Sequence, residues 1–338
     1  MDSEYAARVR WDNLAKPLGS LGLLEDAVVQ IAALTGNADI DLSRRVLLVF
    51  CADNGVVARG VTQSDSSVTA AVARALAAGE STVCPMARAA HCQVIPVDVG
   101  ILDFPGAVGV LNRRVRNGAA DITQGPAMSR EECVEAIRTG MELVQAQKEA
   151  GVSILAAGEM GIGNTTTSSA VASVLLGRPP GELVGRGAGL SDEGLARKRA
   201  AVERAIQVNR PDPVDPIDVL SKVGGLDLAA LCGVYLGGEK YRVPVLLDGF
   251  ISAAAALCAV RLRPEAAQAL IASHVSAEPA GALLLEALGE KPLITAQMRL
   301  GEGSGAVAAL PLLDMALAVY SSGHTFGAMG MEPYTLQC

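Results

Sequence analysis

A glycine-rich segment that could bind phosphate follows an apolar run ending at Ala157. It reads Gly158-Glu159-Met160-Gly161-Ile162-Gly163-Asn164-Thr165-Thr166 and has the spacing of a phosphate-binding loop, with Asn164 in place of the lysine. Glycines let main-chain N–H groups converge on an anion, and a following helix adds its dipole. Without the lysine, the segment suits a monophosphate better than a triphosphate. The alternative is a tight strand-to-helix turn that binds nothing.

A second glycine segment, Gly185-Arg186-Gly187-Ala188-Gly189, precedes a predicted helix that begins near Ser191. Ser191 is a suitable N-cap residue, and the acidic residues after it favour the first helical turn. The same helix carries Lys198, which could reach a phosphate from the side. A solvent-exposed surface lysine is the alternative interpretation, because a G-x-G-x-G pattern alone is weak evidence.

A carboxylate stands between glycines in the segment Gly301-Glu302-Gly303-Ser304-Gly305, immediately before an Ala-rich predicted helix. The neighbours of Glu302 have almost no side-chain bulk, so a planar substrate could approach it closely. We therefore interpret Glu302 as a candidate general base. An exposed glutamate in a turn is the alternative.

Two further polar groups follow or separate apolar stretches. Asp248-Gly249-Phe250 comes after a run ending at Leu247, and Ser273-His274-Val275-Ser276-Ala277-Glu278 lies between two helical stretches. The seryl hydroxyls could bind a carboxylate or a sugar, since a hydroxyl both donates and accepts hydrogen bonds. A lone histidine such as His274 is more often structural than a ligand.

Short apolar runs rich in β-branched residues predict the strands that position these segments. Each run is followed closely by Gly or Asp, and Ala-rich helical stretches lie between the runs, for example at 69–78, 130–150 and 193–208. Such runs are typical of strands buried on both faces of a parallel sheet. Alternating strands and helices predict a doubly wound α/β sheet, whose ligands bind at the carboxyl ends of the strands. The runs are 46–51, 94–99, 152–157 and 243–247.

Both chain ends are predicted to be helical. Residues 1–35 have a helical period and no predicted strand, and residues 306–320 form an Ala/Leu helix. We expect the ends, 1–35 with 306–338, to pack together as a small helical domain. It would lie beside a large α/β domain, residues 36–305, that carries the active site. Residues after Ser321 are predicted to be loosely structured.

The composition excludes several classes of function. The 338 residues carry a formal net charge of −8, which is unfavourable for nucleic-acid binding. Seven cysteines without paired spacing and only three histidines predict reduced, mostly buried thiols, no metal site and no cofactor. The N-terminus lacks a signal pattern, and no apolar stretch reaches the roughly 20 residues of a membrane span. We therefore expect a cytoplasmic protein that binds neither membrane nor nucleic acid.

Seven segments, taken in order, resemble the nicotinate-nucleotide:dimethylbenzimidazole phosphoribosyltransferase family of cobamide assembly. Each motif alone is weak, but seven in the same order are specific, and they extend over nearly the whole chain. The segments are 16–22 (KPLGSLG), 52–56 (ADNGV), 158–166, 185–190, 245–250 (VLLDGF), 273–278 and 299–305 (RLGEGSG).

The resemblance implies a Rossmann-like parallel sheet with helices on both faces, a small helical domain from the two chain ends, and a dimer with sites near its interface. It also implies that nicotinate mononucleotide and an aromatic base give an α-ribazole-type 5′-phosphate and nicotinate, with Glu302 as the catalytic base. Gly187 and Gly189 would lie near the 5′-phosphate, and Ser276 and Gly305 near the nicotinate carboxylate. The other residues assigned to the nucleotide are Glu159, Gly161, Gly163, Asn164, Lys198, Asp248 and Gly303.

The acceptor is less determined by these motifs. The family more often has histidine where Asn54 stands, and segment 62–67 (TQSDSS) is small and polar, without an aromatic residue to stack on a benzimidazole. We expect Asn54, Ser64 and Ser66 to contact an azole, purine or phenol, and dimethylbenzimidazole not to be the only acceptor. A related branch of the family acts on phenol or p-cresol as two paralogous subunits. A homodimer and a heterodimer are therefore both open.

Other classes of function remain as alternatives. One is a nucleotide kinase or dehydrogenase on a similar sheet. Asn164 in place of lysine argues against a kinase, and no acidic residue follows a strand-linked G-x-G-x-x-G at the distance that a dinucleotide site needs. Another is a non-catalytic subunit that completes a paralogue's site. Glu159, Lys198 and Glu302 together argue against it, because a silent subunit has no chemical need for them.

Overall fold

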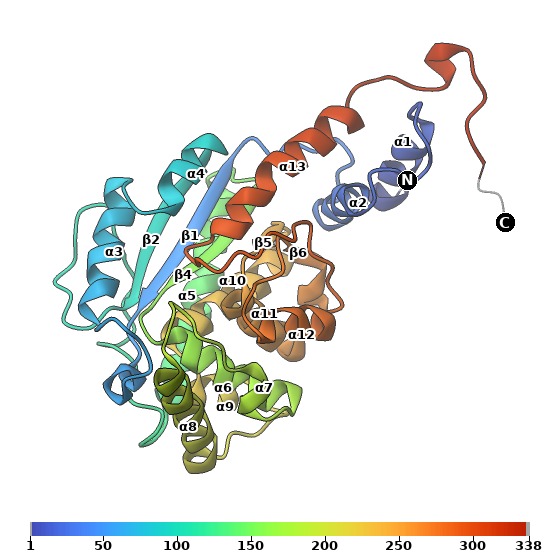
Figure 1. Cartoon of the computed structure of the whole chain (residues 1–338). Coiled ribbons are helices and arrows are strands. Elements are labelled where there is room, and N and C mark those ends of the chain that lie inside the picture. Colours follow the sequence, from blue (N-terminus) through green and yellow to red (C-terminus); the bar gives the residue numbers. More distant parts are fainter. Residues whose placement is uncertain (1, 336–338) are drawn as a thin grey trace.

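The computed structural model describes residues 2–335, and its centre is a parallel sheet (Figure 1). Within this range the sheet has six strands in the order β3-β2-β1-β4-β5-β6. The chain runs outward from β1 to β3 on one side and from β4 to β6 on the other. The point where this direction reverses, between β1 and β4, is where a doubly wound sheet binds its ligands. The strands are β1 (Arg45–Ala52), β2 (Cys92–Gly100), β3 (Leu111–Asn112), β4 (Ile154–Met160), β5 (Val245–Leu247) and β6 (Leu270–Ala272).

The Rossmann-like fold predicted from the sequence is confirmed, and all four predicted strands are present with ends shifted by a few residues. The strands β3 and β6 were not predicted. They have only two and three residues, so neither produces an apolar run long enough to stand out. β6 also follows directly on the 3₁₀ helix Pro264–Ala269, which obscures its beginning.

Alternate residues of β1 enter two different cores, as expected for a strand buried on both faces. Leu48 and Phe50 face one core together with helices α5, α6, α10 and α11. Leu47 and Val49 face the other, together with α3, α4 and most of α13. The helices on the first face are α5 (Arg130–Glu149), α6 (Asn164–Leu176), α10 (Leu226–Tyr241) and α11 (Phe250–Leu262), and those on the second are α3 (Ser67–Ala78), α4 (Val83–Ala89) and α13 (Ser304–Tyr320).

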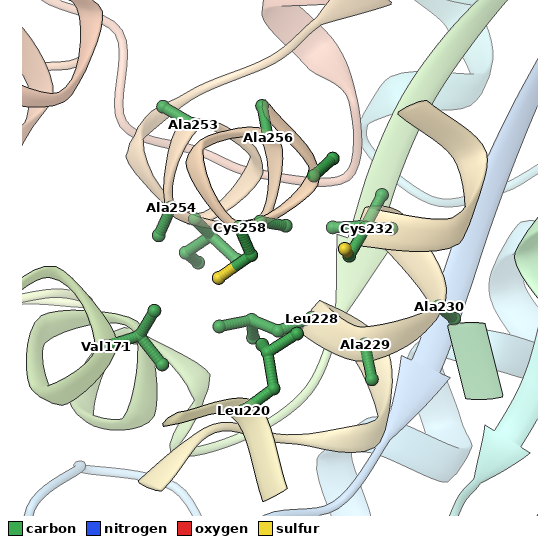
Figure 2. Packing of buried hydrophobic residues seen from close by; sticks show 14 of the residues in the cluster. Val171, Leu220, Leu228, Ala229, Ala230, Cys232, Ala253, Ala254, Ala256 and Cys258 are labelled. Carbon is green, nitrogen blue, oxygen red and sulfur yellow. The ribbon is translucent and has the colours of Figure 1, made fainter. Parts of the chain in front are cut away.

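Small side chains allow the helices of the first core to approach closely (Figure 2). A Cβ atom at Gly140 of α5 would lie 2.0 Å from the carbonyl oxygen of Ala230, and one at Gly233 of α10 would lie 1.9 Å from that of Ile137. The two helices therefore contact each other backbone to backbone. The other helices of this part of the molecule are α7 (Pro180–Leu183), α8 (Asp192–Asn209), α9 (Pro216–Val223) and α12 (Ala280–Leu288).

The two chain ends meet through a third, smaller core. Trp11 of α1 (Ser3–Asn13) packs on Tyr320 at the end of α13, with ring centroids 5.1 Å apart, and α2 (Leu23–Thr35) completes the cluster. Figure 1 shows α13 extending from the sheet to these helices. This packing supports the predicted small helical domain, whose separation from the rest stays a prediction.

The tail after α13 is more ordered in its packing than predicted. It has little regular structure besides a 3₁₀ turn, Gly327–Met329, but Phe326 is buried and Thr325 pairs with Leu14. Residues 336–338, which include Cys338, lie outside the described range. The other six cysteines are free and buried, in agreement with the predicted thiols. None of the helices described is both long and apolar enough to cross a membrane.

Candidate active site

A cavity of about 230 Å³ opens where the carboxyl ends of β4, β5 and β6 meet the loop before α13. This is the edge of the sheet at which the sequence placed the ligand. Nine of the predicted site residues line the cavity, although they come from six separate parts of the chain. They are Glu159, Gly161, Gly163, Asn164, Gly187, Lys198, Asp248, Ser276 and Glu302.

Glu302 lies on the cavity wall in a strained main-chain conformation. Its φ is 59°, in the left-handed region that non-glycine residues rarely adopt, and the φ angles of Gly301 and Gly303 are 87° and 80°. A Cβ at Gly303 would lie 2.3 Å from Leu47, and one at Gly301 would lie 2.9 Å from Glu159 Oε1. Glycine is therefore required on both sides, which is the bare backbone inferred from the sequence.

The Glu302 carboxylate is held from behind by groups distant in the chain. Its Oε2 accepts hydrogen bonds from Ser81 Oγ at 2.8 Å and from the Val83 N–H at 3.1 Å. Its Oε1 accepts none from the described residues. The residue is only 8% exposed, so it faces the cavity rather than bulk water. One oxygen is thus fixed and the other is available to a substrate.

Two buried carboxyl groups near Glu302, those of Glu159 and Asp227, are bridged by the buried amide of Asn164. Asn164 Nδ2 donates to Glu159 Oε2, and also to Asp227 Oδ2 at 3.1 Å. Burial raises the pKa of Glu159 well above its usual range, and Asp227 and Asp248 add to this by repulsion. Burial likewise raises the pKa of Asp227, to about 6. A cationic substrate in this part of the cavity would favour the ionised carboxylates.

Asp248 connects the cavity to the start of α13. Its Oδ1 accepts from the Gly305 N–H at 2.7 Å and its Oδ2 from the Gly303 N–H at 3.2 Å. A carboxylate at a helix N-terminus is stabilised by the unpaired N–H groups there. Burial raises the pKa of Asp248, and His274, 3.9 Å away, opposes that rise.

The glycines that contact Asp248 do not line the cavity. The N–H groups of Gly303 and Gly305 already donate to Asp248 and are not free to bind the nucleotide. A direct contact of these two residues with the nucleotide therefore stays a prediction without structural support. Gly305 has a different role in packing. A Cβ there would lie 1.8 Å from His274 Nδ1.

A cation lies at another part of the cavity wall. Lys198 of α8 is completely buried, and its Nζ donates to Thr165 Oγ1 at 2.8 Å. It is therefore not the surface lysine of the alternative interpretation. Burial lowers its pKa to about 8, partly offset by Glu278. The predicted N-cap of α8 is confirmed, since Ser191 Oγ accepts from the Gly194 N–H.

The predicted acceptor residues lie next to the cavity rather than on its wall. Asn54 is buried, with its Nδ2 3.4 Å from the Ile162 carbonyl, and Ser64 and Ser66 are partly exposed. From the same loop, Val61, Thr62 and Gln63 line the cavity instead. The acceptor contacts of Asn54, Ser64 and Ser66 stay predictions.

Several residues that line or support the cavity were not selected from the sequence. Thr165, Arg186, Glu278 and Arg299 belong to recognised segments, so the segments marked their neighbourhood without identifying them. Ser81 and Asp227 had no such signal, because only the fold brings them to the site. Gln63 joins two walls, since its Nε2 donates to the carbonyl of Gly189.

A family model described as phosphoribosyltransferase matches residues 1–330 of the chain. The chain belongs to this family. The resemblance predicted from the sequence is confirmed, and family membership decides against the kinase and dehydrogenase alternatives.

Two phosphoribosyltransferases and one solved structure are similar to this chain over almost its whole length. The chain is 49% identical to the nicotinate-nucleotide--dimethylbenzimidazole phosphoribosyltransferase of Ruminiclostridium cellulolyticum, over 99% of its own length and 95% of the relative's. Its identity to the protein of that name from Acetivibrio thermocellus is 45%, over 97% and 93% of the two lengths. The crystal structure of CobT from Thermus thermophilus superposes with a TM-score of 0.92 at 42% identity, covering 98% of this chain and 99% of that one.

Proposed function

We propose that this phosphoribosyltransferase moves the 5-phosphoribosyl group of nicotinate mononucleotide to an aromatic base, giving an α-riboside 5′-phosphate and nicotinate. One observation carries the proposal. A single cavity holds a buried cation, Lys198, and several carboxyl groups, among them Glu159, Asp248 and Glu302. A phosphorylated sugar that becomes cationic at its anomeric carbon needs both.

The phosphate would bind near Lys198. The ammonium group is fixed by Thr165, and a Cβ at Gly187 would lie only 3.3 Å from Nζ, so an unsubstituted backbone leaves room beside the cation. Backbone N–H groups and a lysine are a common phosphate-binding combination. Placing the phosphate there directs the ribose toward the carboxyl groups.

The bond between C1′ and the pyridinium nitrogen of nicotinate would break near those carboxyl groups. Its electron pair goes to the ring nitrogen, so nicotinate leaves neutral at that atom and needs no acid. The positive charge that develops on the ribose is stabilised by Glu159 and Asp248 as carboxylates. A nitrogen of the acceptor forms the new bond to C1′, and Glu302 Oε1 takes the acceptor's proton. General-base catalysis of this kind contributes about 10²–10⁴-fold.

The relatives named above support dimethylbenzimidazole among the acceptors. They match over nearly the full chain, and the phenol-activating heterodimer subunit and the non-catalytic partner are not favoured. The cavity wall contains Val61, Met160 and Leu190, against which a flat aromatic ring can pack.

A turnover assay tests the proposal directly. The purified chain is incubated with nicotinate mononucleotide and a panel of azoles, purines and phenols, and products are identified by mass. We expect release of nicotinate together with a base-ribose phosphate, with dimethylbenzimidazole among the substrates. Turnover of no acceptor, alone or with added paralogue, would contradict the proposal.

The dimer and the cellular location are part of the same proposal. Exposed apolar side chains on α13 and in the tail, Met315, Val319, Met329 and Met331, support an association of two copies of this chain. The free cysteines support a reducing compartment such as the cytoplasm. Light scattering of the purified chain is expected to give twice the mass of one chain.

A further inference from the structure

Glu278 is a carboxylate on the cavity wall that the reaction as described does not use. It lies in the loop between β6 and α12, which is held by hydrogen bonds from the Glu278 N–H to Ser276 Oγ and from the Gly281 N–H to the Glu278 carbonyl. Its Oε2 is buried without a hydrogen-bond partner, and no donor within residues 2–335 reaches its other oxygen. The residue as a whole is partly exposed, but a polar atom that is buried without a donor is costly unless a ligand or a shift of the side chain supplies one.

The second glycine segment, residues 185–189, passes directly over the Glu278 side chain. A Cβ at Gly185 would lie 1.9 Å from Glu278 Oε2 and 2.6 Å from Pro279 Cδ, so glycine lets the loop pass over the carboxylate in its present position. Two residues later, Gly187 lies beside Lys198 Nζ. The carboxylate and the cation therefore border the same loop, and no ion pair joins them in the described part of the chain.

Charge restricts what Glu278 can bind. An ionised carboxylate only accepts hydrogen bonds, and it repels a phosphate. Lys198, by contrast, only donates. A ligand that satisfies both must carry anionic oxygens and hydroxyl donors a few bonds apart. A 5-phosphoribosyl group has this combination in its phosphate and its 2′- and 3′-hydroxyls.

We infer that Glu278 is a positioning residue that accepts a hydrogen bond from a ribose hydroxyl of the bound nucleotide and makes the site selective for ribose over deoxyribose. The inference rests on the proposed function, because it takes nicotinate mononucleotide as the ligand. It assigns Glu278 no role in proton transfer. Its effect is to fix the sugar ring between Lys198 and the carboxyl groups at the reacting carbon.

A binding cycle tests the inference. Dissociation constants are measured by titration calorimetry for nicotinate mononucleotide and its 2′-deoxy and 3′-deoxy analogues, with the unmodified chain, Glu278→Ala and Glu278→Gln. Glu286→Ala, at an exposed position of α12, is the matched control. We expect the unmodified chain to bind one deoxy analogue about 10- to 100-fold more weakly, as for a hydrogen bond to a charged group.

The variants separate a hydroxyl contact from a general electrostatic role. Glu278→Ala should bind the parent nucleotide more weakly by a similar factor. Its affinity for that deoxy analogue should be no weaker than its affinity for the parent. Glu278→Gln should lose less, since its amide oxygen still accepts. If Glu278→Ala lost the same factor of affinity for all three ligands, relative to the unmodified chain, the inference would be overturned. So would an unmodified chain that binds both deoxy analogues as well as the parent, even if the alanine variant does not fold.

Turnover of the parent nucleotide by the unmodified chain judges the proposed function separately. Binding without turnover would count against the proposed function alone, and the cycle would still decide the role of Glu278. Absence of both binding and turnover would overturn the two together.

Discussion

Ser81 Oγ donates a hydrogen bond to Glu302 Oε2 over 2.8 Å, although the two residues are 221 positions apart in the chain. Ser81 immediately precedes the turn into α4, and the Val83 N–H contacts the same oxygen. Glu302 is therefore oriented by the start of α4, which packs on the same face of the sheet as α13 although it is distant in the chain. A base held in this way keeps its second oxygen aimed into the cavity.

Replacing Glu302 by alanine is expected to lower kcat by about 10²–10⁴-fold, because the acceptor then loses its proton to water. The dissociation constant for nicotinate mononucleotide should change little, since the phosphate contacts remain. Stopped assays and titration calorimetry measure the two quantities, and Glu286→Ala serves as the control. Full activity of Glu302→Ala would remove this residue from its role.

Replacing Ser81 by alanine is expected to lower kcat by about 10-fold, the order expected for losing one hydrogen bond to a charged group. Because the Val83 N–H still holds the carboxylate, the effect should be smaller than that of Glu302→Ala. The double variant should be no slower than Glu302→Ala alone. Additive losses in the double variant would show that Ser81 acts independently of Glu302.

The lowered pKa of Lys198 predicts a pH dependence of binding. The ammonium form is present below about pH 8 and is lost as the pH rises through that value. The kcat/KM for nicotinate mononucleotide should therefore fall above about pH 8, as it reports the free enzyme. In Lys198→Met, kcat/KM should be low and no longer fall in this range. An unchanged alkaline limb in the variant would assign the titration to another group.

The buried carboxyl of Asp227 predicts a pH dependence of stability. Its folded pKa, about 6, is above its usual value of 3.8, so its contribution to stability is present below that usual value and is lost as the pH rises through the folded pKa. Between pH 4 and pH 8 the free energy of unfolding should fall by about 2 kcal/mol relative to Asp227→Asn. Urea unfolding at both pH values measures the difference, and parallel pH profiles would contradict it.

The close contact of α5 and α10 predicts the effect of adding one methyl group. Gly140→Ala places Cβ about 2 Å from a backbone oxygen, which cannot move without displacing α10. We expect a loss of about 3 kcal/mol in the free energy of unfolding, or no folding. Gly181→Ala, where nothing lies within 4 Å, is the control and should be near neutral.

The sequence predicted those parts of the site whose conformation depends on residues adjacent in the chain. Gly163 and Gly187 have positive φ, as glycine in a loop suggests, and the acid of 301–305 lies on the cavity as expected. The same reasoning placed Lys198 on the correct helix. Its complete burial could not be foreseen, because it depends on how α6 and α8 pack.

What could not be predicted depends on contacts between distant segments. Ser81 and Asp227 reach the site only through the sheet order, and their own neighbours in the chain carry no motif. On the acceptor side the cavity-lining residues Thr62 and Gln63 were not selected, for a related reason. Loop 61–67 turns so that Thr62 and Gln63 face the cavity, which residue types alone do not indicate.

The helix α13 connects the loop that carries Glu302 to the two terminal segments of the chain. Glu302 lies two residues before this helix, and the ring of Tyr320 at its far end packs on Trp11. Its 17 residues make a rod of about 25 Å at 1.5 Å per residue. The inner half of the helix packs on the sheet and its outer end packs on α1 and α2, so the loop that carries Glu302 and the two terminal segments belong to one continuous packed structure.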